Sequence, residues 1–203
     1  MSTGRGGDGL TWLEEDAAAR RVAVDGFVAL WRGERRFIAD LTDEPRLVDD
    51  LVAAGRLEVD EGGVLIGVHG LVTRPTRHRI AHTQGTVNTW CALDAIGIPA
   101  ALGIDADAIT SCPACETELR VTLHRGVPVN GGAMRLWLPT SRCAHLVEDF
   151  CDHANLYCDH DHLSDGVASQ SAGRVIGVAE VAAIGRQTWS DVADAIKRSG
   201  PAS

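Results

Sequence analysis

A cysteine and an aspartate stand three residues apart in a strongly apolar stretch, Cys91 and Asp94 in NTWCALDAIGIPAALG. The Ala, Leu and Ile residues of this stretch predict a helix that begins near Asn88 as its N-cap and breaks near Pro99. Cys91 would then lie in the first turn, where free N–H groups and the helix dipole favour a thiolate, with Asp94 on the same face. The pattern also fits a buried structural cysteine beside a helix-capping aspartate.

A carboxylate inside an apolar helix face is costly unless it has a partner. We therefore interpret Asp94 as an acid–base group for the neighbouring thiol. Ordinary thiols titrate near pH 8.5 and ordinary aspartates near pH 3.9, so proton transfer from Cys91 to Asp94 would be uphill by roughly 6 kcal/mol. Burial raises the pKa of an aspartate, and a soft metal ion bound to sulfur removes the thiol proton, so metal-assisted thiol chemistry is expected.

Further cysteines and histidines with metal-ligand spacing follow in the C-terminal half of the chain. SCPAC contains the C-x-x-C pair Cys112 and Cys115, and EDFCDHANLYCDHDH contains Cys151, Cys158, His160 and His162. Cysteine and histidine at short spacing are zinc ligands, so a structural zinc ion held by Cys112, Cys115 and a nearby Cys or His is one expectation. The scattered histidines are interpreted as ordinary polar residues, namely His69, His78, His82, His124 and His145.

Composition limits the class of protein. The chain has 203 residues, 45% of them hydrophobic, which is enough for one sizeable domain or for a small domain joined to a larger one. The net charge of -9 argues against a nucleic-acid partner. No apolar run approaches the roughly 18 residues of a membrane span, and MSTGRGGDGL lacks a signal-peptide core. We therefore expect a cytoplasmic protein whose clustered cysteines are metal ligands or catalytic groups.

The fold class that the pattern predicts is α+β, with a winged-helix-like N-terminal module packed on a mixed α/β catalytic core with antiparallel strands. Residues 1–20 are expected to be disordered or loosely helical, residues 21–80 to form the module, and residues 81–203 to form the core. A short helix at 38–41, a second helix that ends at Gly55, and two strands around the turn 60–63 give the winged-helix outline.

A winged helix suggests DNA binding, but the second helix of this outline is acidic. One basic residue, Arg46, stands against four carboxylates that would repel phosphates: Asp43, Glu44, Asp49 and Asp50. A helical module that packs on the larger domain is therefore favoured over a DNA reader.

Several motifs, taken in order, resemble those of the organomercurial (alkylmercury) lyases over about residues 25–192: TWCALDAIGIPAALG, SCPACETELRVTL, RLWLP, DFCDHANLY and GVAEVAAIGRQTW. The resemblance implies that Cys91, Asp94 and Cys151 carry the reaction, and that Cys112 has a structural part. The sequence departs from the usual family pattern at three places. Asp152 stands where a second adjacent cysteine is common, and Cys115 and Cys158 are additions.

Two thiols and one acid suffice to cleave a carbon–mercury bond by protonolysis. Thiolates are the soft ligands that mercury prefers, and two of them push electron density toward the carbon, which then accepts a proton. We expect Cys91 to be the first mercury ligand, Cys151 the second, and Asp94 the proton carrier. The products would be a hydrocarbon and Hg(II), with no organic cofactor. The resemblance further implies that cytosolic thiols, or a partner such as mercuric reductase, remove the ion in mercury detoxification.

Two other classes remain open from the sequence. One is a winged-helix metalloregulator, against which the acidic second helix counts. The other is a non-catalytic soft-metal or zinc-binding homologue that has kept the scaffold. Trp90, Leu93 and Ile98 are candidates to line an apolar substrate pocket, although core packing accounts for at least two of them.

Overall fold

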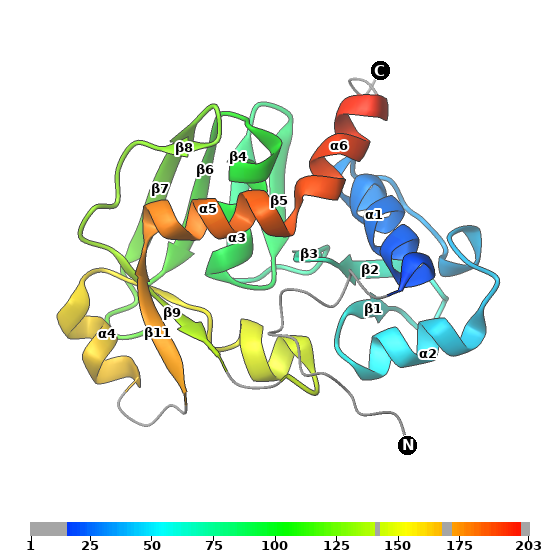
Figure 1. Ribbon diagram of the computed structural model, residues 1–203, viewed down its shortest axis with the longest axis horizontal. Coiled ribbons are helices and arrows are strands. Elements are labelled where there is room, and N and C mark those ends of the chain that lie inside the picture. The colour runs from blue at the N-terminus through cyan, green and yellow to red at the C-terminus, as the bar shows by residue number, and fades with distance from the viewer. Residues whose placement is uncertain (1–15, 141–142, 168–171, 200–203) are drawn as a thin grey trace.

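The computed structural model describes residues 16–140, 143–167 and 172–199 (Figure 1). Residues 1–15 of the expected N-terminal segment lie outside the described residues. The predicted α+β class with antiparallel sheets is confirmed. None of the helices in the described part of the chain has both the length and the apolar character to cross a membrane.

The N-terminal part contains two helices followed by a hairpin. Helix α1 (Ala17–Trp31) begins at Asp16, whose carboxylate accepts hydrogen bonds from Ala18 N at 2.8 Å and Ala19 N at 3.2 Å. The 3₁₀ helix η2 (Ile38–Asp40) and helix α2 (Pro45–Ala53) follow, and Gly55 adopts φ +62 just after α2. Strands β1 (Leu57–Val59) and β2 (Leu65–Val68) then pair antiparallel. The winged-helix description of this segment stays a prediction.

Strands β1 and β2 are also the edge of the main sheet, so this sheet extends across the boundary that we expected near residue 80. Its eight strands run in the order β1-β2-β3-β5-β4-β6-β7-β8, and each neighbouring pair is antiparallel. The further strands of this sheet are β3 (Leu71–Val72), β4 (Arg79–His82), β5 (Gly85–Thr89), β6 (Ala106–Ser111), β7 (Glu118–His124) and β8 (Val127–Pro128).

The described part of the chain also contains a second, three-stranded sheet, four more α-helices and one short π-helical turn, η3 (Val147–Cys151). The order of this sheet is β10-β9-β11, with β9 (Arg135–Pro139) central, β10 (Leu156–Tyr157) and β11 (Gly173–Gly177). The helices are α3 (Ala92–Leu102), α4 (His160–Val167), α5 (Val178–Thr188) and α6 (Ser190–Ser199). Figure 1 shows α6 beside α1 on one side of the molecule, and α4 beside the small sheet on the other.

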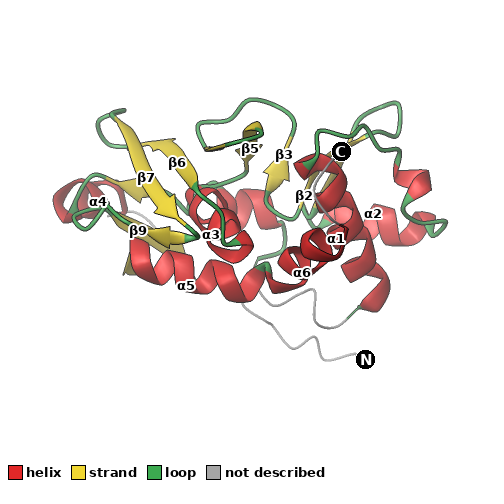
Figure 2. Ribbon diagram, turned by 90° about the horizontal axis from the view of Figure 1, so that it is seen from above, coloured by secondary structure: helices red, strands yellow, loops and turns green. Residues whose placement is uncertain are grey.

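Helix α3 is the centre of the core. Every residue from Ala92 to Ala100 is buried, including one carboxylate. The helix packs against strands of the main sheet on one side and against α5 on the other, as Figure 2 shows from above. A helix that is apolar on all sides suits a position between two layers.

The ends of α3 differ from the prediction. Asn88 lies in β5, where it pairs with Val72 and with Arg79, so it cannot cap a helix. The N-cap is instead Cys91, with φ -144 and ψ 176. Pro99 does not break the helix, which continues to Leu102 and ends at Gly103 in the left-handed region. The start of α3 is set by the pairing of Asn88 with neighbouring strands. The local composition of the stretch could not show this pairing.

The backbones of α3 and α5 touch at two glycines. A Cβ atom on Gly185 would lie 2.2 Å from the Cα of Gly97, and one on Gly97 would lie 2.6 Å from Cζ3 of Trp189. Only glycine fits at this crossing, and the contact fixes α5 against the helix that carries Asp94.

We expect Gly185→Ala to lower the melting temperature by at least about 2 °C, because overpacking of this kind costs about 1–3 kcal/mol and each kcal/mol shifts the melting temperature of a chain of this size by about 2–4 °C. Gly132→Ala is the control: a Cβ at Gly132 meets no atom within 4 Å and its φ is not positive, so we expect no loss of melting temperature. Calorimetry of both variants tests the contact, and equal melting temperatures would contradict it.

Candidate active site

The structure brings together the two sulfur atoms and the carboxylate that the sequence singled out. The ligand atoms of Cys91, Asp94 and Cys151 all lie within 4.8 Å of one another. Cys91 is the N-cap of α3 and Asp94 is in its first turn, whereas Cys151 ends the short π-helical turn η3 (Val147–Cys151). All three are buried, with exposed fractions of 0%, 5% and 3% in this order. Three polar side chains thus share one almost dry site.

Cys91 and Asp94 cap the helix reciprocally. The Asp94 carboxylate accepts a hydrogen bond from Cys91 N at 3.0 Å, and the Cys91 sulfur faces the backbone N–H of Asp94. This is the geometry of a capping box, with a thiol in the place usually held by a hydroxyl. The next residue, Ala92, donates from its N–H to Ala154 O at 3.2 Å, which links the helix start to the segment that follows Cys151.

Burial sets the protonation of the site. It raises the pKa of Asp94 from 3.8 to about 7, although hydrogen bonds from the Cys91 thiol and from backbone N–H groups act in the opposite direction. Burial also raises the pKa of Cys91, and the hydrogen bond to Cys151 and the charge of Asp94 add to this effect. The thiolate expected from the helix dipole is therefore not the resting form of Cys91, because loss of hydration outweighs the dipole.

The pKa of Cys151 is raised as well. The hydrogen bond with Cys91 lowers this pKa, but burial and the negative charges of Asp94 and Asp152 outweigh it. Both thiols therefore carry their protons near neutral pH, while Asp94 is close to its midpoint. A carboxyl group in this state can accept a proton in one step and return it in another.

A narrow pocket with about 30 Å³ of free volume reaches this site, and its wall includes Asp94 and Cys151. Its other walls are mostly apolar or aromatic: His69, Gly70, Trp90, Leu93, Leu146, Phe150, Thr188 and Trp189. Trp90 and Leu93 line it, which is one more of the three candidates than the sequence led us to expect. Ile98 does not line this pocket and is fully buried in the core.

Cys151 also borders a second pocket of about 160 Å³ on another side. This pocket is polar, and its wall includes Arg74, Arg77 and Asp152. Asp152, the residue that departs from the family pattern, thus stands next to Cys151 at this opening. Cys151 therefore borders both an apolar space and a basic space, whereas Cys91 lines neither pocket.

Sequence reasoning missed His69 and Gly70. His69 is buried, and burial lowers its pKa to about 3, so it is a neutral imidazole in contact with the rings of Phe27 and Trp189. Its carbonyl accepts a hydrogen bond from Trp189 Nε1 at 2.9 Å. Gly70 has φ +93, and a Cβ there would lie 3.0 Å from the Asp94 Cγ. The sequence feature that could have indicated them is the dipeptide His69-Gly70 directly after a predicted strand, because glycine permits a turn with positive φ at that point.

The other candidate metal ligands lie in a separate cluster. Cys112, Cys115, Cys158 and His162 place their ligand atoms within 4.8 Å of one another. His160 is not in this group, and its Nδ1 lies 3.1 Å from Ser164 Oγ. The pair that we predicted, Cys112 and Cys115, is thus joined by one cysteine and one histidine from a distant segment.

Comparisons with known proteins identify the family. The family described as alkylmercury lyase (MerB) matches residues 71–190, which include both cysteines and the aspartate of the site. The alkylmercury lyase of Streptomyces lividans is 29% identical over 155 residues, which are 73% of this chain and 71% of that protein. The alkylmercury lyase of Staphylococcus epidermidis is 26% identical over 133 residues, which are 64% of this chain and 61% of that protein.

A solved structure shares the fold of this chain. A crystal structure of the mercury-bound form of MerB2 matches with a TM-score of 0.80 over 92% of this chain and 98% of that chain, at 15% identity. The likeness shows that the two proteins share a fold. Because the family match spans more than half of the sequence, this chain belongs to the alkylmercury lyase family.

We expect Gly70→Ala to move the Asp94 carboxyl and to lower carbon–mercury lyase turnover at least tenfold. Gly63→Ala is the matched control, because Gly63 also has positive φ (+76) but no atom lies within 4 Å of its added Cβ. Both variants should lose stability from backbone strain, and Gly63→Ala should keep turnover within about twofold. Equal turnover in the two variants would show that Gly70 does not position Asp94.

The raised pKa of Asp94 predicts a pH-dependent cost of burial. Between about pH 4 and pH 7 the folded chain holds a proton on Asp94 that the unfolded chain has released, so the Asp94 contribution to stability falls as pH rises through this window. The free energy of unfolding of the wild type, minus that of Asp94→Asn, should therefore fall by about 4 kcal/mol between pH 4 and pH 8. Urea denaturation at each pH measures it, and a pH-independent difference would rule out the shift.

Proposed function

We propose that this chain cleaves the carbon–mercury bond of organomercurials by protonolysis, yielding a hydrocarbon and Hg(II), and that it serves mercury detoxification in the cytoplasm. The observation that carries the proposal is the convergence of Cys91, Asp94 and Cys151 within 4.8 Å in a buried site. Two soft ligands and one acid of matched pKa are what the reaction requires. Membership of the alkylmercury lyase family supports the same substrate class.

The first stage is capture of the metal by sulfur. In a substrate R–Hg–X, one cysteine replaces X on mercury, and its proton leaves with X as HX. The two pockets at Cys151 support this residue as the first sulfur to meet the substrate, which reverses the order we expected from the helix position. The mostly apolar pocket that Leu93 and Trp189 line suits the organic group R.

The second stage moves one proton. When the other thiol binds mercury, its proton passes to the ionised Asp94 carboxylate, and mercury then holds R and two sulfur atoms. Asp94 returns the proton to the carbon, the electron pair of the Hg–C bond goes to the new C–H bond, and R–H leaves. The balance is R–Hg–X plus two thiols giving R–H, HX and a mercury dithiolate. A pKa of about 7 lets Asp94 act in both directions near neutral pH.

The low polarity of the site favours the proton-transfer stage. Neutral thiols and a half-protonated acid are tolerated in a buried site, whereas isolated charges are not. Mercury binding converts both thiols to bound thiolates without leaving a free charge.

Release of Hg(II) requires other thiols, because the dithiolate is buried. The polar pocket beside Cys151 supports a route for them, since Arg74 and Arg77 would attract the carboxylates of a small cytosolic thiol. A protein partner such as mercuric reductase, with its own cysteines, could take the ion by the same exchange of sulfur ligands. Neither route needs an organic cofactor.

We expect Asp94→Asn to lower hydrocarbon release at least 100-fold while the variant binds as many Hg(II) ions per chain as the wild type, because the proton carrier is lost and both sulfur atoms remain. The assay is gas chromatography of benzene or methane from phenyl- or methylmercury with excess thiol. Asp105→Asn, at an exposed position outside the site, is the control and should keep full activity. Normal turnover by Asp94→Asn would refute the role of Asp94, and wild-type protein that binds Hg(II) without releasing hydrocarbon would refute catalysis.

A further inference from the structure

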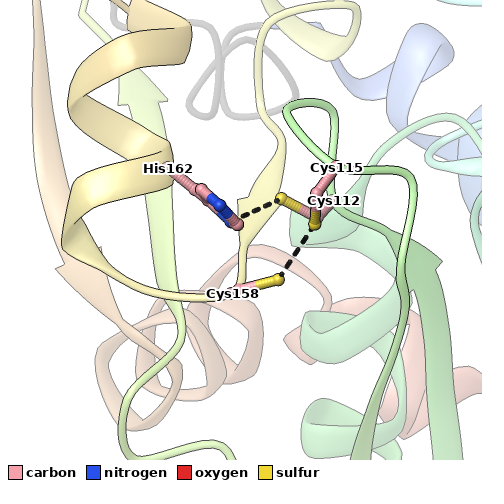
Figure 3. Close-up of side chains that lie close together, drawn as sticks. All are labelled: Cys112, Cys115, Cys158 and His162. Carbon is pink, nitrogen blue, oxygen red and sulfur yellow. Dashed lines mark hydrogen bonds between the residues drawn. The ribbon is translucent and has the colours of Figure 1, made fainter.

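Four metal-ligating side chains that are distant in sequence meet away from the active site (Figure 3). Cys112 and Cys115 come from the turn between β6 and β7. Cys158 follows β10, and His162 lies in the first turn of α4. The four face one another across the gap between these two segments, and none of them has a part in the protonolysis proposed above.

Their spacing fits one ion with four ligands. Cys115 Sγ lies 3.5 Å from Cys158 Sγ, and Cys112 Sγ lies 3.8 Å from His162 Nδ1. A tetrahedral zinc ion with Zn–S bonds of about 2.3 Å holds its ligand atoms about 3.8 Å apart. These two distances match edges of such a tetrahedron, and all six distances within the set are at most 4.8 Å, which keeps the four ligands around a single ion.

Both segments hold these ligands through backbone hydrogen bonds of their own. In the Cys112 turn, Cys112 N donates to Thr117 O at 2.9 Å, and Glu116 N donates to Cys112 O at 2.8 Å. Glu116 takes φ +60, which folds the chain back after Cys115. At the other segment, Asp159 Oδ1 accepts from His162 N at 2.9 Å and fixes the start of α4.

We propose that Cys112, Cys115, Cys158 and His162 bind one Zn²⁺ in a closed, four-coordinate structural site. Three thiolates and one imidazole in tetrahedral arrangement form a common zinc ligand set, and the spacings C-x-x-C and C-x-x-x-H are those of zinc-binding motifs. Cys158 and His162, which are distant in sequence, thereby complete the pair Cys112 and Cys115 that the sequence indicated. This proposal does not depend on the lyase mechanism.

The ion would tie the segment that carries Cys151 to the main sheet. Only β10 and a short turn separate Cys151 from Cys158, and Ala154 O in this turn accepts the hydrogen bond from Ala92 N beside Cys91. A metal bound to Cys158 therefore fixes one end of the segment 151–158. The other end of this segment is Cys151, which carries the second sulfur atom of the active site. Its role is positioning, because none of its ligands lines either pocket beside Cys151.

A disulfide between Cys115 and Cys158 is the competing use of these sulfurs. It would bring the two sulfur atoms from 3.5 Å to about 2.0 Å. It would also leave Cys112, buried, and His162 with no role in the cluster, although both face it. The convergence of all four side chains favours the metal.

The test is the zinc content of the full chain, purified under reducing conditions without added metal. Elemental analysis should give about one zinc per chain for the wild type. Cys158→Ser and His162→Ala should each lower zinc at least fivefold, and both should melt at a lower temperature. Cys143→Ser and Cys91→Ser are the matched controls, since these cysteines lie outside the cluster, and both should keep the full zinc content.

Cobalt substitution keeps the test independent of whether the variants fold. Wild-type protein stripped of metal should take up one Co²⁺ and show the intense visible absorption of a tetrahedral thiolate complex. Three results would each overturn the proposal: wild type without zinc that also fails to take up Co²⁺, zinc that is lost in Cys91→Ser but kept in Cys158→Ser, or Cys115 and Cys158 recovered as a disulfide. Since no organomercurial enters these measurements, failure here is separate from failure of the lyase assay.

Discussion

The burial of one carboxyl group is the constraint on which the active site depends. Asp94 lies in a helix with no exposed face, so hydration by water can stabilise its negative charge only slightly. Loss of hydration brings its pKa to about 7, while the N–H of Cys91 keeps the carboxyl oriented. A more exposed carboxyl would stay ionised at neutral pH and would be a poor proton donor to carbon.

Much of the surrounding structure holds this group in place without taking part in the chemistry. Gly70 leaves room for the carboxyl where any side chain would press against it. The contact of Gly97 with Gly185 fixes α3 against α5. The hydrogen bond from Ala92 N to Ala154 O fixes the start of α3 against the segment that follows Cys151. Each of these contacts is long-range in sequence, so the site exists only when the whole fold has formed.

The sequence predicted which side chains of the candidate site come together better than it predicted their setting. Cys91 and Asp94 were identifiable because a thiol and an acid in an apolar stretch demand a reason, and the α+β class followed from the pattern of strands and helices. The start of α3 was wrong because Asn88 is held by its partners in the sheet, which local composition does not reveal. The thiolate expected at Cys91 was wrong because the dipole effect was weighed without knowing the depth of burial.

Residues that act through their position were the hardest to predict. Gly70 and His69 have ordinary residue types, and only the folded backbone turn brings Gly70 against Asp94 and His69 against Trp189. The pair Cys112 and Cys115 was visible as a motif, but its partners depended on how β10 and α4 fold back onto the turn between β6 and β7. Spacing within a motif is a local property, whereas the completion of a ligand set is a tertiary one.

The two clusters of soft ligands differ in a way that separates their chemistry. The site at Cys91 offers two sulfur atoms, an acid and a pocket, so a bound metal keeps a position for a carbon ligand. The cluster at Cys112 offers four ligands in closed arrangement, so a bound metal has no position left for a substrate. Under the two proposals above, the number of ligands and the access to the metal, more than the type of ligand, separate a site that can react from one that can only stabilise the fold.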